Sequence, residues 1–184
     1  MDTIQTLINR SSVLYSEVEI KNAINHIAYQ VNQSIHANEL YVLVAMNGAL
    51  IFAGQLLPQI KKNIQYQYIH ATRYENSLTG DSIRWLVMPP KDIENRTVLI
   101  LDDILDEGIT LNEMVSLCRT MNAKEIYTAV LFDKELEKNK SHLSDFTGLK
   151  VPNRFVFGYG LDCKVLGRNL SHLYALNLKH LMFT

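Results

Sequence analysis

Four carboxylates lie within six consecutive residues near the middle of the chain, with no basic side chain among them. They are Asp102, Asp103, Asp106 and Glu107. Crowded carboxylates repel one another, and this repulsion raises their pKa values unless a cation or a hydrogen-bond donor relieves it. A divalent cation and a run of sugar hydroxyls are two ligand types that can do so. The cluster therefore indicates a site for a metal ion, a sugar, or both.

A glycine and a threonine, Gly108 and Thr110, come directly after the cluster. A glycine-containing turn that leads into a helix presents backbone amides and the positive end of the helix dipole, and both favour a phosphate group. A phosphorylated sugar would satisfy the acids and the turn together. Asp106 and Glu107 could instead be ordinary acidic residues of a first helical turn. That explanation does not cover the acidic pair at 102–103.

The hydrophobic pattern indicates the elements that must position this turn. The apolar run at 97–101 predicts a buried strand, residues 102–108 a turn, and residues 110–121 a helix. A capping box formed by Ser16 and Glu19 predicts the start of another helix. The remaining expected elements are strands at 40–45, 65–73, 83–88, 126–132, 155–158 and 173–176, a helix at 50–57, and an irregular charged segment at 134–150.

Alternating buried strands and helices are typical of an α/β fold with a mainly parallel twisted sheet flanked by helices. In such sheets the ligand binds at the carboxyl ends of the strands. The acidic turn follows one of these strand ends. We therefore expect the chemistry of the protein to be located at that edge of the sheet.

Length and composition exclude several classes of protein. A chain of 184 residues indicates a single domain. A net charge of −1 argues against a strongly basic nucleic-acid-binding surface, and two cysteines without ligand spacing argue against a disulfide framework or a zinc site. The sequence shows neither a signal peptide nor an apolar run long enough for a membrane span. We expect a cytoplasmic protein.

Residues 98–111 read VLILDDILDEGITL, and this stretch resembles the phosphoribosyl-pyrophosphate motif of the type I phosphoribosyltransferases. The pattern is long and specific. It consists of four apolar residues, two acids, two apolar residues, an acid, any residue, Gly, any residue and Thr. The similarity is strongest to the purine branch of the family, the hypoxanthine-guanine phosphoribosyltransferases. It implies the type I phosphoribosyltransferase fold, with one domain over residues 1–184 and a small hood built from about 1–15 and 150–184.

The resemblance also implies an activity and a cofactor. The implied reaction is the Mg²⁺-dependent transfer of the phosphoribosyl group of phosphoribosyl pyrophosphate to N9 of a 6-oxopurine. Hypoxanthine or guanine would give IMP or GMP and pyrophosphate, in purine salvage. Asp106 would be the catalytic base, and Asp102 and Asp103 would bind the ribose and, with Asp162, the magnesium. The residues implied for the 5′-phosphate are Asp106, Glu107, Gly108, Ile109 and Thr110.

The same resemblance assigns residues outside the acidic motif. Lys134 would donate to the 6-oxo group of the purine, and Phe155 would stack on its ring. The Val156 backbone would read the purine edge, and Asp162, also implied for the purine site, would lie near the magnesium and pyrophosphate. Tyr74 begins a polar stretch that resembles the loop closing over the site. The residues implied for pyrophosphate are Met46, Asn47, Gly48 and Arg168.

Phosphoribosyl pyrophosphate and a purine base are the expected partners, and the family implies a homodimer or homotetramer. No membrane or nucleic-acid partner is expected. Two alternatives remain open. One is a catalytically weak regulator of the same fold that binds nucleotide or RNA, although RNA binding needs a basic surface. The other is a receiver-type signalling module, which also clusters acids at strand ends but does not need the phosphate cradle at Gly108 and Thr110.

Overall fold

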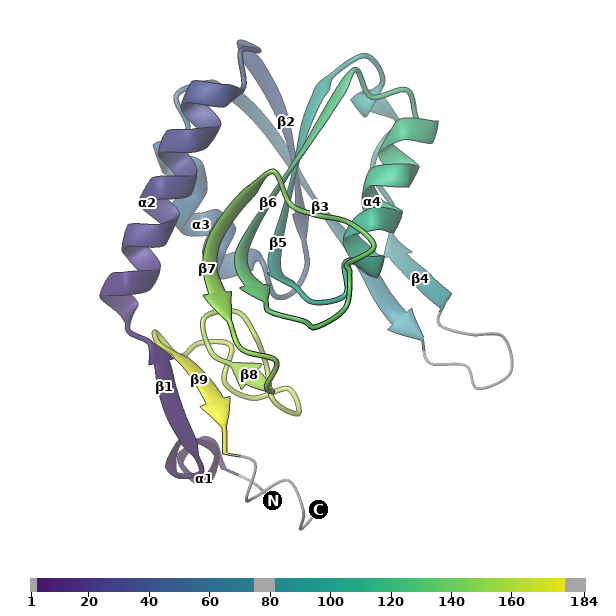
Figure 1. The fold of residues 1–184 in the computed structure, drawn as a ribbon. Coiled ribbons are helices and arrows are strands. Elements are labelled where there is room, and N and C mark those ends of the chain that lie inside the picture. Colours follow the sequence, from purple (N-terminus) through teal and green to yellow (C-terminus); the bar gives the residue numbers. More distant parts are fainter. Residues whose placement is uncertain (1–2, 75–81, 178–184) are drawn as a thin grey trace.

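The computed structural model describes residues 3–74 and 82–177. A six-stranded sheet forms its centre, with the strand order β4-β3-β2-β5-β6-β7 (Figure 1). Neighbouring strands are parallel except β3 and β4, which pair antiparallel. The strands are β2 (Glu39–Ala45), β3 (Asn63–Tyr74), β4 (Ser82–Val87), β5 (Thr97–Leu105), β6 (Glu125–Lys134) and β7 (Phe146–Val151). The predicted α/β fold with a mainly parallel sheet is confirmed.

Helices cover both faces of this sheet: α2 (Glu17–Ser34) and α3 (Leu50–Leu56) lie on one face and α4 (Ile109–Thr120) on the other (Figure 1). The predicted capping box begins α2, because the Ser16 hydroxyl accepts from the Glu19 amide and the Glu19 carboxylate accepts from the Ser16 amide. Short 3₁₀ helices follow at η1 (Leu57–Gln59) and η2 (Lys91–Ile93). None of the helices in the described ranges has the length and apolar content that crossing a membrane requires.

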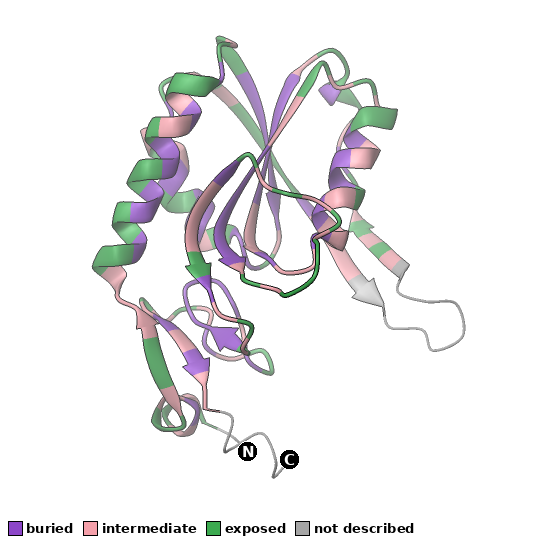
Figure 2. Cartoon of the chain, in the orientation of Figure 1, coloured by how far each residue is buried: buried purple, intermediate pink, exposed green. Residues whose placement is uncertain are grey.

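The core is split by the sheet into two main clusters of buried side chains. Figure 2 shows the buried residues along the central strands and on the helix sides that face them. Within β2, Val42 and Val44 pack with α2 and α3, whereas Tyr41 and Leu43 pack on the α4 side. A strand buried on both faces needs a continuous apolar sequence, which is the pattern that predicted it.

A small antiparallel sheet forms a hood beyond the carboxyl ends of the main strands (Figure 1). Its strands are β1 (Ser11–Tyr15), β8 (Val156–Phe157) and β9 (Leu173–Leu176), and α1 (Ile4–Asn9) precedes them. These segments come from both terminal regions, as expected for the hood. Val156 and Leu173 belong to the same buried cluster as α2, so the hood shares the core of the main sheet. The single-domain organisation stays a prediction.

Two segments differ from the expectations. The strand predicted at 97–101 continues to Leu105, so Asp102 and Asp103 lie in β5 and not in the turn. The ladder to β6 extends that far, pairing Asp102 with Val130 and Leu105 with Asp133. The segment 134–150 is only partly irregular, because residues 146–150 belong to β7. This edge strand is fixed by its pairing with β6, which the charged segment before it does not reveal.

Candidate active site

A pocket with a volume of about 420 Å³ lies at the carboxyl ends of β2, β3 and β5. This is the edge at which a parallel α/β sheet binds its ligand. The pocket brings together all of the residues predicted for sugar, phosphate, pyrophosphate and metal. They are Met46, Asn47, Gly48, Asp102, Asp103, Asp106, Glu107, Gly108, Ile109, Thr110, Asp162 and Arg168.

The two carboxylates of β5 are half-buried and adjacent. The Asp103 amide donates to Asp102 Oδ1 at 3.0 Å, and the Ile104 amide donates to Asp103 Oδ1 at 2.9 Å. Burial raises the pKa of both side chains, and the neighbouring Asp103 charge raises the pKa of Asp102 further. Sugar hydroxyls or a cation would relieve this repulsion. The pair is therefore suited to bind a polyhydroxylated or metal-bound ligand.

The turn between β5 and α4 has the form of a phosphate cradle. Gly108 has a φ of +78°, which favours glycine, and a Cβ at this position would lie 2.7 Å from the His142 carbonyl oxygen. None of the described side chains caps the helix that begins at Ile109. Its first amides have no partner within the helix, and the helix dipole is positive there. The 106–110 amides can therefore donate hydrogen bonds to an anion.

The turn after β2 passes very close to the β5 carboxylates. The peptide bond between Met46 and Asn47 is cis. A Cβ on Gly48 would lie 1.6 Å from Asp103 Oδ2, and a Cβ on Gly160 of the hood would lie 2.1 Å from the Gly48 carbonyl oxygen. Gly48 is thus enclosed between the sheet and the hood, and only a glycine leaves room for the Asp103 side chain.

The hood contributes an arginine and a carboxylate to the pocket. Arg168 Nη2 lies 2.5 Å from Asp162 Oδ1, and Arg168 Nη1 donates to the Gly160 carbonyl oxygen at 2.6 Å. Asp162 Oδ2 also accepts from the Val165 amide at 2.8 Å. Among the described residues that line the pocket, Arg168 is the one Arg or Lys, and five are Asp or Glu. A polyanionic ligand would therefore need additional positive charge.

Asp106 forms an ion pair with a residue of the next strand. Lys134 Nζ lies 2.6 Å from Asp106 Oδ2, and the Lys134 side chain is only 14% exposed. The register of β5 and β6 explains this contact, because Leu105 pairs with Asp133 and the following residues emerge side by side. A proton acceptor and a cationic donor are thus adjacent, with Asp106 lining the pocket and Lys134 beside it but not among the lining residues.

The structure does not place every predicted residue in the pocket. Phe155 is 46% exposed and precedes β8, and Val156 is buried within that strand; neither lines the pocket. Tyr74 ends β3. The polar loop predicted to follow Tyr74 lies outside the described residues. The role in purine binding implied for Lys134, Phe155, Val156 and Asp162 stays a prediction.

Sequence reasoning missed several residues around the pocket. His70 and Thr72 of β3 line it, and the strand expected at 65–73 could have indicated them because its carboxyl end had to reach the same edge. Lys138 forms an ion pair with Glu107, and the Ser141 amide donates to the Glu107 carbonyl oxygen at 2.8 Å. No pattern in the sequence indicated these contacts.

The acidic residues fit a magnesium ion that is shared with a substrate. Within the described part of the chain, no three His, Cys, Asp or Glu side chains gather closely enough to hold a metal by themselves. Magnesium usually keeps several waters and binds one or two carboxylates together with substrate phosphates. Asp102 and Asp103 are hard oxygen donors whose raised pKa values reflect unrelieved burial and, for Asp102, repulsion by its neighbour. They fit that mode of binding.

Comparisons with known proteins agree with this geometry. The phosphoribosyl transferase domain family matches residues 12–164, which include all of the predicted site residues except Arg168. Hypoxanthine-guanine phosphoribosyltransferases from Aquifex aeolicus and Bacillus subtilis are each 30% identical, over 89% of this chain and 93% and 92% of their own lengths. A crystal structure of a hypoxanthine-guanine phosphoribosyltransferase from Bacillus anthracis, with HEPES in the active site, has a TM-score of 0.83 at 27% identity, covering 90% of this chain and 98% of that one. The chain therefore belongs to the type I phosphoribosyltransferase family.

Proposed function

We propose that this protein transfers the phosphoribosyl group of phosphoribosyl pyrophosphate to N9 of a 6-oxopurine, hypoxanthine or guanine. The products are IMP or GMP and pyrophosphate, and the role is purine salvage. The observation that carries the proposal is the contact of 2.6 Å between Lys134 and Asp106 beside the phosphate cradle. Relatives named hypoxanthine-guanine phosphoribosyltransferase support it.

The Lys134–Asp106 pair matches one edge of a 6-oxopurine. That edge carries an acceptor, the 6-oxo oxygen, next to N7. Lys134 donates to the oxygen, and Asp106 accepts a proton near N7 as the purine attacks through N9, which is general-base assistance. Adenine presents a donor amino group to the ammonium instead, so the pair disfavours it. Phe155 stacks on the ring and the Val156 backbone reads the edge.

The sugar and its phosphate occupy the β5–α4 segment. Asp102 and Asp103 accept hydrogen bonds from the ribose hydroxyls, which relieves the repulsion that raises the pKa of Asp102. The 106–110 amides and the Thr110 hydroxyl hold the 5′-phosphate, with Gly108 allowing the tight turn. Binding through several fixed groups orients the reacting carbon of the ribose toward the base.

The pyrophosphate lies between the 46–48 turn and the hood. Asn47 and Gly48 offer polar backbone groups, and Arg168 offers a positive charge. Asp102, Asp103 and Asp162 would hold magnesium, which when bound supplies charge that stabilises the leaving pyrophosphate. Arg168 keeps its place through Asp162 and the Gly160 carbonyl oxygen.

We also propose that the chain forms a homo-oligomer through the exposed face of β3 that carries Tyr66 and Tyr68. Tyr66 and Tyr68 share one face of β3 and are 65% and 53% exposed, and Leu86 of β4 is exposed as well. Exposed aromatic and aliphatic side chains gathered on one surface are typical of an interface. Sedimentation of the wild type and of a Tyr66→Glu, Tyr68→Glu variant tests this. Unchanged mass in the variant would place the interface elsewhere, and a monomeric wild type would exclude it.

The function is tested by pyrophosphate release from phosphoribosyl pyrophosphate with Mg²⁺, using hypoxanthine, guanine, xanthine, adenine and uracil separately. Turnover with 6-oxopurines that is lost in chelator supports the proposal. Turnover with adenine or uracil alone would contradict the assigned base. Tight binding of phosphoribosyl pyrophosphate without turnover of any base would favour a regulatory protein of the same fold.

A further inference from the structure

We propose that Lys140 is a positioning residue for the phosphate cradle and acts through the carbonyl group of Leu105. The inference rests on the proposed function only in assigning the 106–110 amides to a 5′-phosphate. Lys140 lies in the β6–β7 loop (residues 135–145), and it is not among the residues that line the pocket.

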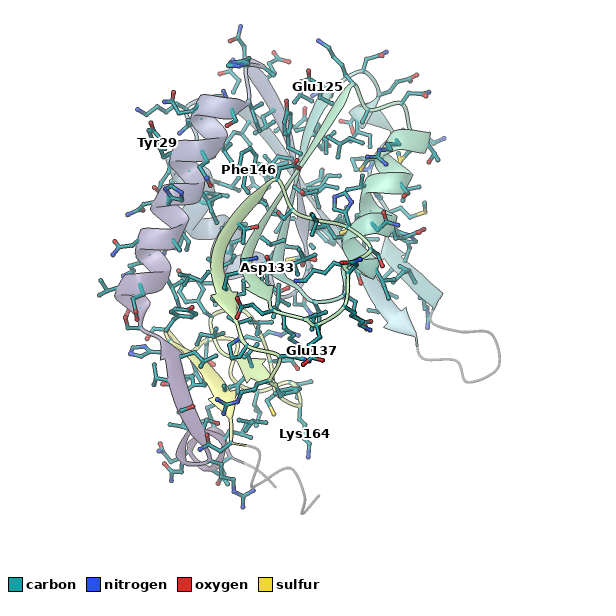
Figure 3. The ribbon with its side chains drawn as sticks, viewed as in Figure 1. Tyr29, Glu125, Asp133, Glu137, Phe146 and Lys164 are labelled. Carbon is teal, nitrogen blue, oxygen red and sulfur yellow. The ribbon has the colours of Figure 1, made fainter. Side chains whose placement is uncertain are left out.

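The Lys140 side chain is almost fully buried, with 9% of its surface exposed. Its ammonium donates to the Leu105 carbonyl oxygen at 2.8 Å and forms an ion pair with Asp133. Leu105 ends β5, and Asp133 is the last residue but one of β6, where Figure 3 labels it near the carboxyl end of the sheet. One cation therefore joins the ends of the two strands that carry Asp106 and Lys134.

The contact with Leu105 controls the first amide of the cradle. The Leu105 carbonyl and the Asp106 N–H belong to the same planar peptide unit, and in a trans peptide they point in opposite directions. Holding the carbonyl on the Lys140 side therefore fixes the direction of the Asp106 N–H. A cation on the carbonyl also polarises the peptide unit, which makes its N–H a stronger donor to an anion.

The charge on Lys140 is only partly neutralised by Asp133. Asp133 also forms an ion pair with Lys150, whose side chain is 62% exposed. Two ammonium groups thus share one carboxylate, and Lys140 retains positive charge to place on the Leu105 carbonyl. Lys150 also donates to Asp133 but, within the described residues, makes no hydrogen bond to Leu105, so it provides a matched control.

The residues after Lys140 hold the same turn in place. The Ser141 amide donates to the Glu107 carbonyl oxygen at 2.8 Å. The His142 backbone packs against Gly108 so closely that a Cβ there would lie 2.7 Å from its carbonyl oxygen. The loop therefore follows the cradle turn over three consecutive residues. Lys140 adds a charged contact where that turn begins.

The experiment compares the full chain with Lys140→Met, Lys140→Arg and Lys150→Met. Calorimetry gives the dissociation constants of IMP and of inosine, which differ only in the 5′-phosphate, and their ratio isolates the phosphate contribution. We expect Lys140→Met to weaken IMP binding by about tenfold, the scale of one lost charged hydrogen bond, and to leave inosine binding unchanged. In Lys140→Arg the ratio of the inosine to the IMP dissociation constant should return close to the wild-type value. In Lys150→Met this ratio should equal that of the wild type.

A purely structural role for Lys140 would lower the affinity for IMP and inosine equally. That result, or an unchanged IMP affinity in Lys140→Met, would overturn the inference. Thermal unfolding checks each variant, and if Lys140→Met does not fold the ratio is measured with Lys140→Gln, which keeps a donor without charge. A wild-type protein that does not prefer IMP to inosine also overturns it. A wild-type protein that prefers IMP but releases no pyrophosphate with any base contradicts the proposed function instead, and the ratio still decides the role of Lys140.

Discussion

The ammonium group of Lys134 lies 2.6 Å from the carboxylate of Asp106, although the two residues are 28 positions apart in the chain. They follow directly on a pair of residues, Leu105 and Asp133, that are matched in the parallel ladder of β5 and β6. The sheet register therefore builds the contact before any ligand arrives. An acceptor and a donor held by adjacent strands need little rearrangement to meet the edge of a base.

Replacing Asp106 by Asn should lower the turnover number by 10²- to 10⁴-fold, on the order of the contribution of general-base catalysis. The amide keeps the size of the side chain but cannot take up the proton. Binding of phosphoribosyl pyrophosphate, measured by calorimetry, should change far less, since the cradle amides remain. Wild-type turnover in Asp106→Asn would remove Asp106 from the chemistry.

Replacing Lys134 by Met should raise the KM for hypoxanthine roughly 10- to 100-fold, because a charged hydrogen bond to the 6-oxo group is lost. The selectivity for hypoxanthine over adenine should fall at the same time, and steady-state assays with both bases measure it. Lys138→Met removes a cation that pairs with Glu107 and not with Asp106. It should leave the KM for hypoxanthine unchanged, and an equal rise in both variants would argue for a general charge effect.

Adding a methyl group at position 48 should damage the site. In Gly48→Ala the new Cβ would overlap the Asp103 carboxylate, which must move. Displacement by about 1 Å is expected to lower turnover on the order of 100-fold. Gly54→Ala is the matched control, because nothing lies within 4 Å of its Cβ and the position is inside α3. It should keep full activity and gain roughly 0.5–1 kcal/mol of stability; equal losses in both variants would contradict the steric argument.

The ion pairs of Asp133 predict a pH-dependent stability. Burial alone would raise the pKa of Asp133, but hydrogen bonds to Lys140 and Lys150 and their positive charges outweigh it, so the pKa lies below its usual value. A carboxylate whose pKa is lower in the folded than in the unfolded state stabilises the fold at pH values above the unfolded pKa, which is about 3.9 for Asp. This stabilisation is lost as the pH falls through the folded-state pKa. Asp133→Asn should therefore cost about 3 kcal/mol at neutral pH, since it leaves Lys140 buried without a counter-ion.

Urea unfolding from pH 7 down to pH 3 measures this difference, which should shrink at the acidic end. Lys150→Met removes only the exposed partner of Asp133 and should cost less than about 1 kcal/mol. A difference between Asp133→Asn and the wild type that stayed constant with pH would show that the side chain contributes by packing and not by charge.

The part of the site that consists of residues close together in the chain is predictable from the sequence. The acids at 102–107, Gly108 and Thr110 form one segment, so their spacing alone indicates a sugar and phosphate site, and the pocket brings them together. The end of β5 was misplaced because the strand continues only through its ladder with β6, and pairing between distant segments leaves no local pattern. The same reason applies to β7 at the edge of the sheet.

The ion pairs of Lys138 and Lys140 with carboxylates could not be predicted from the sequence for a related reason. Lys138 and Lys140 lie in a charged stretch, which is typical of an exposed loop, yet the Lys140 side chain is buried against Leu105 and Asp133. Their contacts depend on the path of the whole loop over the cradle. The family resemblance supplied Lys134 and Arg168, which spacing alone would not have separated from other surface cations.

The hood approaches the main sheet at Gly160 and Gly48, where a Cβ on Gly160 would lie 2.1 Å from the Gly48 carbonyl oxygen. The height of the hood over the sheet is therefore set there by main-chain atoms, and this close approach requires glycine at position 160. This distance does not depend on the side chains of neighbouring hood residues, because both atoms in contact belong to the backbone or to the added Cβ. Over evolution, substitutions at neighbouring positions should therefore change the dimensions of the pocket at this junction less than a substitution of Gly160 would.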